Sequence, residues 1–214
     1  MNQPSSAPGS PASSPAVITL LAANVLTYLA QLANPGPMDR WFALWTLNLD
    51  FPNASRFESW QLLTYGFLHG GNAHLMFNML ALWMFGMAME RAWGSMRFVT
   101  YYLLCIIGAG LMQLAANEIG GSGSRVVGAS GGVLGLLLAF GLAFPNRRVM
   151  LLFPPIPMRA ITLVVIYGVL TLFMGLTGTV SFVAHFAHLG GMVAGLILTR
   201  FWPQTFPTRW HPKR

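Results

Sequence analysis

Charged residues are scarce in this chain of 214 residues: only 8% are Asp, Glu, Lys or Arg, whereas 55% are hydrophobic. A soluble globular domain carries about 25% charged residues, so this sequence lacks the polar coat that a soluble fold of its size requires. Acidic residues are the scarcest charged type, with five Asp and Glu against 12 Lys and Arg. The composition excludes an ordinary soluble domain and indicates a protein whose outer surface contacts lipid.

The chain has a single cysteine, Cys105, which excludes an intrachain disulfide. Because Cys105 lies in an apolar stretch, we interpret it as a small buried residue rather than a reactive thiol. The net charge of +7 is also typical of nucleic-acid-binding proteins. Here the basic residues lie in short loops between apolar runs, where they orient a membrane protein, and we therefore expect no nucleic-acid partner.

Three regions differ in composition along the chain. Residues 1–15 are rich in Ser, Pro and Ala and contain no Lys or Arg, which predicts a disordered tail. Residues 203–214 contain three prolines among basic side chains and are interpreted as a basic cytoplasmic tail. Residues 16–202 form the predicted membrane domain.

The membrane domain contains six apolar runs, and a helix needs about 20 apolar residues to cross the hydrocarbon core. The predicted spans are residues 16–33, 73–89, 96–116, 130–144, 160–178 and 182–202. The fourth span is short. The sequence therefore predicts an all-α, polytopic bundle of six transmembrane helices.

The distribution of basic residues predicts the orientation of this bundle. Arg40, Arg56 and Arg125 fall on one side of the six spans, and the other nine of the 12 Lys and Arg residues fall on the opposite side. By the positive-inside rule both termini face the cytoplasm. The first loop, residues 34–72, is rich in aromatic residues, which favours an interfacial position over a fully solvated cap.

Polar side chains inside membrane helices are costly and are therefore candidates for function. In the predicted topology four of them lie at the outer ends of even-numbered spans, at similar depth: His74, Asn78, Ser130 and His188. A histidine beside a serine is the usual way to activate a weak hydroxyl nucleophile. Ser130 and His188 are therefore the candidate catalytic pair.

Glycines near both residues support this pairing, because small residues four positions apart let helix backbones pack closely. The glycines near the site are Gly128, Gly131 and Gly135 in span four and Gly191 and Gly195 in span six. If the two glycine faces pack together, Ser130 and His188 come within hydrogen-bond reach. Taken singly, each of these features is more often structural than catalytic.

None of the five acidic residues lies at the outer end of an even-numbered span, which favours a Ser–His dyad over a triad. His74 and Asn78 share a helix face and are able to donate hydrogen bonds to a developing oxyanion. A structural network that holds span two to its loop explains them equally well. For His69 and His185 we favour a structural or water-binding role. The histidines have no carboxylate partner and make a poor zinc site, so no metal and no cofactor is expected.

Several motifs resemble those of the rhomboid family of intramembrane serine proteases. The match covers about residues 57–198. It consists of Trp60-Gln61-Leu62-Leu63-Thr64 in the first loop, His74-Leu75-Met76-Phe77-Asn78, Glu90-Arg91 with Gly94-Ser95, Gly128-Ala129-Ser130-Gly131, and Ala187-His188-Leu189-Gly190-Gly191. The chain departs from the family in two places. Gln61 replaces the usual arginine after Trp60, and Leu134 replaces an aromatic residue that stacks on the histidine in some members.

The resemblance implies a role for each matching residue. Ser130 is the nucleophile, His188 its general base, and His74, Asn78 and the Ser130 backbone amide form the oxyanion site. It also implies a core of six helices, and substrates that are transmembrane segments of other proteins, cut near the outer membrane face after lateral access beside span five. We expect the bacterial cytoplasmic (inner) membrane as location, and the oligomeric state stays open. Two other readings are a non-catalytic relative that binds membrane helices and a transporter with a proton-relay histidine, although the chain lacks the repeated halves typical of transporters.

Overall fold

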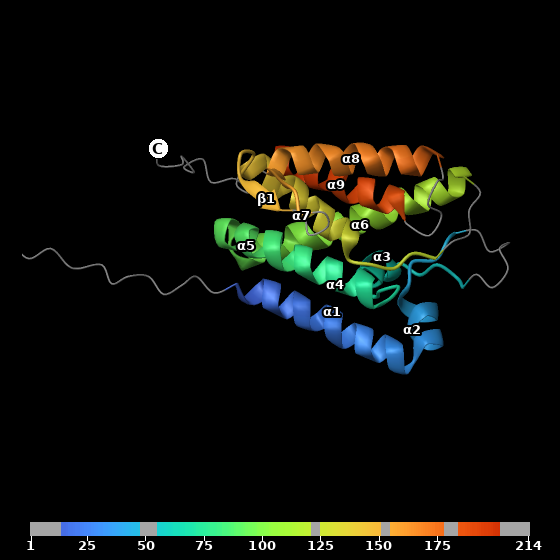
Figure 1. The fold of residues 1–214 in the computed structure, drawn as a ribbon. Helices are drawn as coiled ribbons and strands as arrows, with labels where there is room; N and C mark the ends of the chain where they lie inside the picture. The colour runs from blue at the N-terminus through green and yellow to red at the C-terminus, as the bar shows by residue number, and fades with distance from the viewer. Residues whose placement is uncertain (1–13, 48–54, 121–124, 151–154, 178–183, 202–214) are drawn as a thin grey trace, which may run out of the picture.

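The structure, a computed structural model, describes residues 14–47, 55–120, 125–150, 155–177 and 184–201. The predicted disordered tail therefore lies outside the described residues except for Ser14 and Pro15, and the predicted basic tail lies outside them entirely. The described part is mostly helical (Figure 1).

Helices occupy all six predicted spans. They are α1 (Pro15–Ala33), the consecutive segments α4 (Asn72–Ala81), η2 (Leu82–Gly86) and α5 (Met87–Trp93), then α6 (Ser95–Gly120), α7 (Ser130–Ala143), α8 (Ala160–Thr177) and α9 (His185–Phe201). Among the described residues, α1, α6 and α8 are long and apolar enough to cross a membrane, whereas α7 has 14 residues and α9 has 17. The structure thus supports a membrane protein with several spans, and the count of six stays a prediction.

The second predicted span is one continuous helix that contains a short segment with π-helical hydrogen bonding. The segment η2 is a short π-helix, and the residues at both of its boundaries keep right-handed helical dihedral angles, so the chain does not turn there. The helix ends at Gly94, whose φ of 81° is a left-handed conformation that glycine adopts without strain. A π-helical segment inside an α-helix is often found near functional sites.

The loop between α7 and α8 contains a small hairpin that the all-α prediction missed. Strand β1 (Arg148–Met150) pairs antiparallel with β2 (Pro157–Arg159), and Val149 between the two exposed residues of β1 is buried. Pro155 and Pro157 cannot extend a helix because proline lacks the backbone N–H. The segment is therefore extended, and the short ribbon ends where α8 begins.

The described parts of the first loop pack around Gln61. It contains α2 (Pro35–Phe42), α3 (Gln61–Thr64) and the 3₁₀ turn η1 (Tyr65–Phe67). The Gln61 side chain is fully buried; it accepts hydrogen bonds from the Trp45 and Glu58 amides, both at 3.3 Å, and donates to the Trp41 and Arg56 carbonyls at 3.5 Å. The residue that departs from the family motif thus helps to hold this loop together, as do the side-chain bonds of Trp60 and Thr64.

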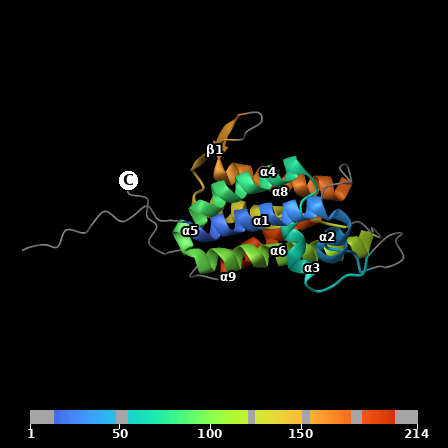
Figure 2. The same ribbon diagram turned by 90° about the horizontal axis from the view of Figure 1, so that it is seen from below.

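The centre of the bundle is formed by α6, α7 and α9, which pack on one another, and α7 is buried along most of its length. In contrast, α1 and α8 lie at the periphery and expose apolar side chains such as Leu26 and Phe173 (Figures 1 and 2). Lipid tails are suitable neighbours for such faces. The helices α4, α7 and α9 all run in the same direction, so their first residues lie toward the same end of the bundle (Figure 1).

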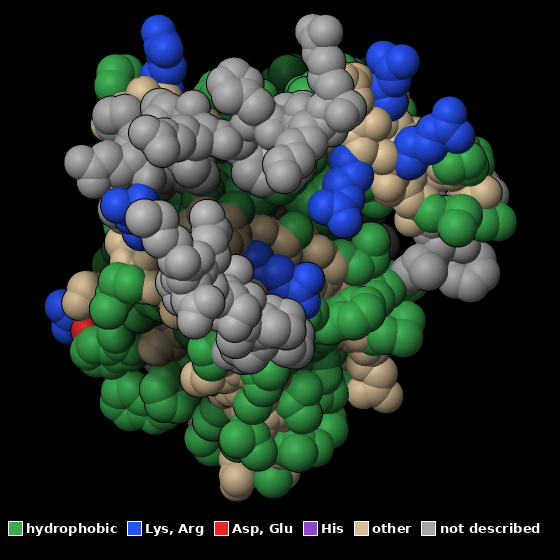
Figure 3. Space-filling model, turned by 90° about the vertical axis from the view of Figure 1, so that its left-hand side faces the viewer, with side chains coloured by type: hydrophobic (Ala, Val, Ile, Leu, Met, Phe, Trp, Pro, Cys, Tyr) green, Lys and Arg blue, Asp and Glu red, His purple; other side chains and the backbone are tan. Residues whose placement is uncertain are grey.

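Basic side chains gather at the other end of the bundle, where α5 and the hairpin lie (Figure 3). Arg91 is in the last turn of α5, Arg200 is in the last turn of α9, and Arg148 and Arg159 are paired across the hairpin. These are residues that the charge count assigned to one side of the membrane. These four arginines thus lie at one end of the bundle, and which membrane face this end meets stays a prediction.

Glu90 joins three helices at this end. Its carboxylate is buried and accepts hydrogen bonds from the backbone N–H groups of Ala16 and Val17, both at 2.9 Å, and from the Ser95 hydroxyl at 2.6 Å. The first N–H groups of a helix have no acceptor within the helix, and a negative charge is favourable there. Glu90 therefore caps α1 and holds it to the α5–α6 turn.

We expect Glu90→Ala to lower the free energy of unfolding by at least about 2 kcal/mol, because three donors to a charged acceptor lose their partner. Thermal unfolding in detergent micelles, followed by tryptophan fluorescence, measures this loss. Glu58→Ala is the matched control, since Glu58 is a half-buried first-loop carboxylate away from α1. Equal melting temperatures for the two variants would contradict the role of Glu90 as a cap.

Candidate active site

A cavity of about 1630 Å³ opens at the end of the bundle where α4, α7 and α9 begin. His74 and Asn78 of α4, Ser130 of α7 and His188 of α9 all line it. Side chains of η2 and α8, including Met84 and Tyr167, also line the cavity. The four polar residues selected from the sequence therefore face one space.

Ser130 is the first residue of α7, and the backbone before it has an unusual shape. Gly128 has a φ of 133°, a conformation that residues with a side chain rarely adopt. Its N–H donates to the Tyr65 carbonyl at 2.9 Å, which ties the approach to Ser130 to the first loop. As the first helical residue, Ser130 also has a backbone N–H without an acceptor in its own helix.

His188 lies in the first turn of α9, and its Nε2 is 2.7 Å from the Ser130 Oγ. This is the length of a strong hydrogen bond. When Nε2 accepts the serine proton, the other ring proton is on Nδ1. Among the described residues no carboxylate is hydrogen-bonded to His188.

Glycines set the distance between α7 and α9. A Cβ added to Gly191 would collide with the backbone carbonyl of Gly131, and one added to Gly195 would lie 3.2 Å from the Gly135 Cα. The two glycine faces proposed from sequence are thus in direct backbone contact. This contact is what brings the starts of the two helices within hydrogen-bond reach.

Gln113 of α6 is a site neighbour that the sequence interpretation missed. Its Oε1 accepts a hydrogen bond from the Ala187 backbone N–H at 3.0 Å, and its Nε2 donates to Asn117 Oδ1 at 2.8 Å. Ala187 precedes His188, so Gln113 satisfies a free N–H in the first turn of α9 and holds that turn in place. The sequence does contain a signal for this role, because Gln113 is a polar residue inside the apolar third span.

His74 has a defined tautomer in this arrangement. Its Nδ1 accepts a hydrogen bond from the Gly70 backbone N–H at 3.2 Å, so the ring proton of the neutral imidazole is on Nε2. The Nε2 edge of the ring lies against Gly128, where a Cβ would be 2.8 Å from Nε2 and 3.7 Å from the Ser130 Oγ. His74 therefore presents an N–H donor beside the serine.

Asn78 is 5% exposed, and its Nδ2 donates to the His74 carbonyl one turn earlier at 3.0 Å. One of its two amide protons is therefore used within α4, and the other remains for a group in the cavity. Asn78 can therefore hold α4 together with one proton and donate to an oxyanion with the other, so the two interpretations of this residue are compatible.

The other two histidines pack against these rings. His69 is buried with its ring centroid 5.2 Å from that of His74, and burial, with a smaller effect of His74, lowers the pKa of His69 to about 4. His69 is therefore neutral at neutral pH. His185 is buried, and its ring lies nearly perpendicular to that of His188 with the ring centroids 6.5 Å apart. His188 thus has an aromatic neighbour although position 134 is a leucine.

The chemistry of this arrangement is that of nucleophilic acyl transfer. It offers a hydroxyl hydrogen-bonded to an imidazole, with N–H donors from His74 and from the Ser130 backbone close by. Among the described residues, no three His, Cys, Asp or Glu side chains are grouped so that they could hold a metal ion.

The comparisons with known proteins find similarity to rhomboid proteins. A family model described as Rhomboid domain matches residues 56–204. The Rhomboid protease GluP of Bacillus subtilis (strain 168) is 36% identical over 138 residues, which are 64% of this chain and 25% of that protein. RHOMBOID-like protein 4 of Arabidopsis thaliana is 31% identical over 144 residues, 66% of this chain and 33% of that protein.

The Rhomboid protease AarA of Providencia stuartii is similar over a longer stretch, with 27% identity over 210 residues that make up 85% of this chain and 70% of that protein. The chain spans a quarter to a third of the length of the first two relatives. The similarity therefore concerns the helical domain rather than the whole of those longer proteins.

Gly128→Ala tests the contact between His74 and the approach to Ser130. The new methyl group strains the backbone at φ 133° and collides with the His74 ring, so we expect the ring to move away from Ser130. The ¹⁵N signals of the His74 side chain, in protein labelled at histidine, report the loss of the single Nε2-protonated tautomer. Gly36→Ala is the control because nothing lies within 4 Å of its Cβ position. Identical His74 signals in both variants would contradict the contact.

Proposed function

Since this chain belongs to the rhomboid family, a family of intramembrane proteases, we propose that it is a serine endopeptidase that cleaves transmembrane segments of other membrane proteins. Its catalytic groups are Ser130 and His188. The observation that carries the proposal is the 2.7 Å hydrogen bond between the Ser130 Oγ and the His188 Nε2 inside the cavity.

The reaction begins when His188 Nε2 removes the Ser130 hydroxyl proton and the Oγ attacks the substrate carbonyl carbon. The resulting oxyanion accepts hydrogen bonds from the His74 Nε2–H, the Ser130 backbone N–H and the free amide proton of Asn78. The protonated His188 then gives its proton to the leaving amine, and the peptide bond breaks. Water, activated by the same imidazole, hydrolyses the acyl-enzyme and regenerates Ser130.

Within the part of the chain that the structure describes, no carboxylate orients the histidine of the proposed dyad. A triad aspartate holds the imidazole in one tautomer and position. In this proposal the orientation comes from packing: Gln113 holds the Ala187 N–H, the His185 ring lies nearly perpendicular to the His188 ring, and the glycine contact keeps α9 against α7. Each of these supports the hydrogen bond to Ser130 without contributing a charge.

We further propose that cleavage takes place near the outer membrane face and that both termini are cytoplasmic. The six spans within residues 16–202 and the basic side chains at the opposite end of the bundle support this orientation. A substrate helix reaches the cavity laterally beside α8, whose side chains line it, and unwinds locally to expose a carbonyl. The membrane is the bacterial cytoplasmic membrane in this proposal.

Ser130→Ala and His188→Ala are expected to abolish cleavage of a single-span reporter by the protein reconstituted in lipid. Removal of either member of such a pair costs about 10⁴- to 10⁶-fold in kcat, because the two act as a unit. Product formation is followed on gels over several hours. A serine-directed phosphonate should label the wild type much more than His188→Ala, because His188 activates the serine in this mechanism.

Equal cleavage by wild type and both variants would indicate a contaminating protease and remove the support for this function. No cleavage and no phosphonate labelling by a folded wild-type sample would favour a non-catalytic relative that binds membrane helices.

His74→Ala and Asn78→Ala are expected to act on kcat more than on KM, because their donors meet an oxyanion that exists only in the transition state. The loss of one such donor costs about 10²- to 10³-fold. We expect the larger loss for His74→Ala, since Asn78 already uses one amide proton within α4. Steady-state kinetics with a quenched fluorescent reporter give both constants. A change confined to KM in either variant would assign that residue to substrate binding instead.

A further inference from the structure

Two separate loops bring the site together. One consists of residues 68–71 and leads into α4 with His74, and the other consists of residues 125–129 and leads into α7 with Ser130. The second loop is joined to the first-loop region by backbone hydrogen bonds. Val126 and Leu44 exchange two of them, at 2.9 and 3.0 Å, and Gly128 donates to Tyr65.

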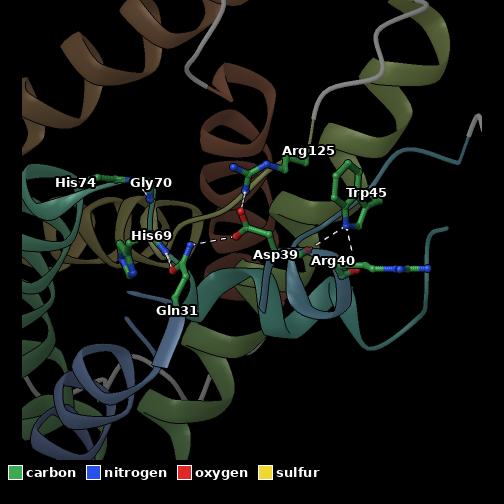
Figure 4. A network of polar contacts seen from close by, with 8 residues as sticks. All are labelled: Gln31, Asp39, Arg40, Trp45, His69, Gly70, His74 and Arg125. Atoms are coloured by element: carbon green, nitrogen blue, oxygen red, sulfur yellow. Dashed lines mark hydrogen bonds and ion pairs between the residues drawn. The ribbon is translucent and has the colours of Figure 1, made fainter. Parts of the chain in front are cut away.

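An ion pair lies beside these backbone bonds. The guanidinium of Arg125 is 2.7 Å from the Oδ2 of Asp39 in α2 (Figure 4). The arginine side chain is 44% exposed and the aspartate 19%. Ion pairs with this much exposure contribute little to folding stability, so the contact of the other Asp39 oxygen matters more here.

The Asp39 Oδ1 accepts a hydrogen bond from the Nε2 of Gln31 in α1 at 3.1 Å. This bond determines which way the Gln31 amide points, so its Oε1 faces the other loop. The Oε1 accepts the backbone N–H of His69 at 3.0 Å, and both His69 and Gln31 are buried. A carboxylate suits this position because both of its oxygens act as acceptors.

The next residue completes the connection. The Gly70 N–H donates to the His74 Nδ1 at 3.2 Å, and this bond places the ring proton on the Nε2 that faces the site. A continuous series of contacts therefore runs from Arg125, five residues before the serine, to the ring of His74 (Figure 4).

We propose that Asp39, Arg125 and Gln31 form a positioning relay for the oxyanion donor His74. The relay holds the His69–Gly70 backbone at the distance that fixes the His74 tautomer and ring position, and it ties this backbone to the loop that carries Ser130. The inference rests on the proposed function, in which His74 Nε2–H meets the oxyanion. Asp39 and Gln31 are not among the residues that line the cavity, whereas Arg125 is. Asp39 and Gln31 therefore act on the reaction through His74.

The test is Asp39→Asn, which keeps the size of the side chain but leaves one acceptor oxygen for two donors. We expect kcat to fall roughly 10-fold with little change in KM, which is less than the 10²-fold or larger loss of an oxyanion donor. Arg125→Gln should have a similar effect, and Arg125→Lys should restore most of the rate because it keeps the charge.

Arg40→Gln is the matched control. Arg40 follows Asp39 in α2, is exposed, and its side chain points away from the relay (Figure 4). Arg40→Gln removes a positive charge, as Arg125→Gln does, and it removes that charge from the helix that contains Asp39. We expect kcat to stay at the wild-type value. If Asp39→Asn retains the same kcat as Arg40→Gln, the relay is wrong.

A double-mutant cycle distinguishes an effect of Asp39 on the position of His74 from a general disturbance of the fold. If Asp39 acts through His74, Asp39→Asn should have no further effect on kcat in a His74→Ala background. An undiminished 10-fold fall in that background would overturn the relay and assign Asp39 a structural role. Gln31→Met breaks the same series at a different point and should show the same dependence on His74.

Histidine ¹⁵N spectra test the relay without any cleavage. In wild type the His74 side chain should show a single Nε2-protonated tautomer, and in Asp39→Asn its two nitrogen signals should move toward those of a tautomer mixture. Unchanged His74 signals in Asp39→Asn would overturn the relay. If wild type cleaves no more than Ser130→Ala, the proposed function fails, and these spectra still decide on the relay.

Discussion

The closeness of α7 and α9 is the constraint on which the site depends. Where Gly191 meets the Gly131 carbonyl and Gly195 meets Gly135, backbone lies directly on backbone, with no side chain between. One methyl group at these positions would separate the helices, whereas a hydrogen bond weakens beyond about 3.2 Å. The Ser130–His188 distance of 2.7 Å is therefore a result of helix packing rather than of either residue alone.

The third central helix, α6, satisfies polar groups that this close packing leaves inside the bundle. The Tyr101 hydroxyl donates to the Gly135 carbonyl at 3.0 Å, and Gln113 accepts the Ala187 N–H near the start of α9. In a lipid environment an unpaired backbone group costs several kcal/mol. These two side chains therefore fix α6 against α7 and α9 in one register, and the register in turn positions His188.

The few acidic residues of the chain act as anchors. Glu90 caps α1 at the end of the bundle that collects arginines, and Asp39 joins α2 to α1 and to the loop before Ser130 at the other end. Both carboxylates use both oxygens. In a chain with only five acidic residues, two thus hold the peripheral α1 and the first loop to the core that carries Ser130 and His188.

The sequence by itself determined the membrane class, the helix positions and the four polar residues of the site, because apolar runs and rare polar side chains are local properties of a chain. The motif around Ser130 and His188 also identified the family. The sequence missed the β-hairpin, Gln113 and the contacts of Asp39, and it left the role of Asn78 open. These features consist of contacts between residues up to 86 positions apart, as for Arg125 and Asp39. Only the packed helices decide such contacts, because a side chain acquires its partner and its tautomer from the neighbours that the fold brings to it.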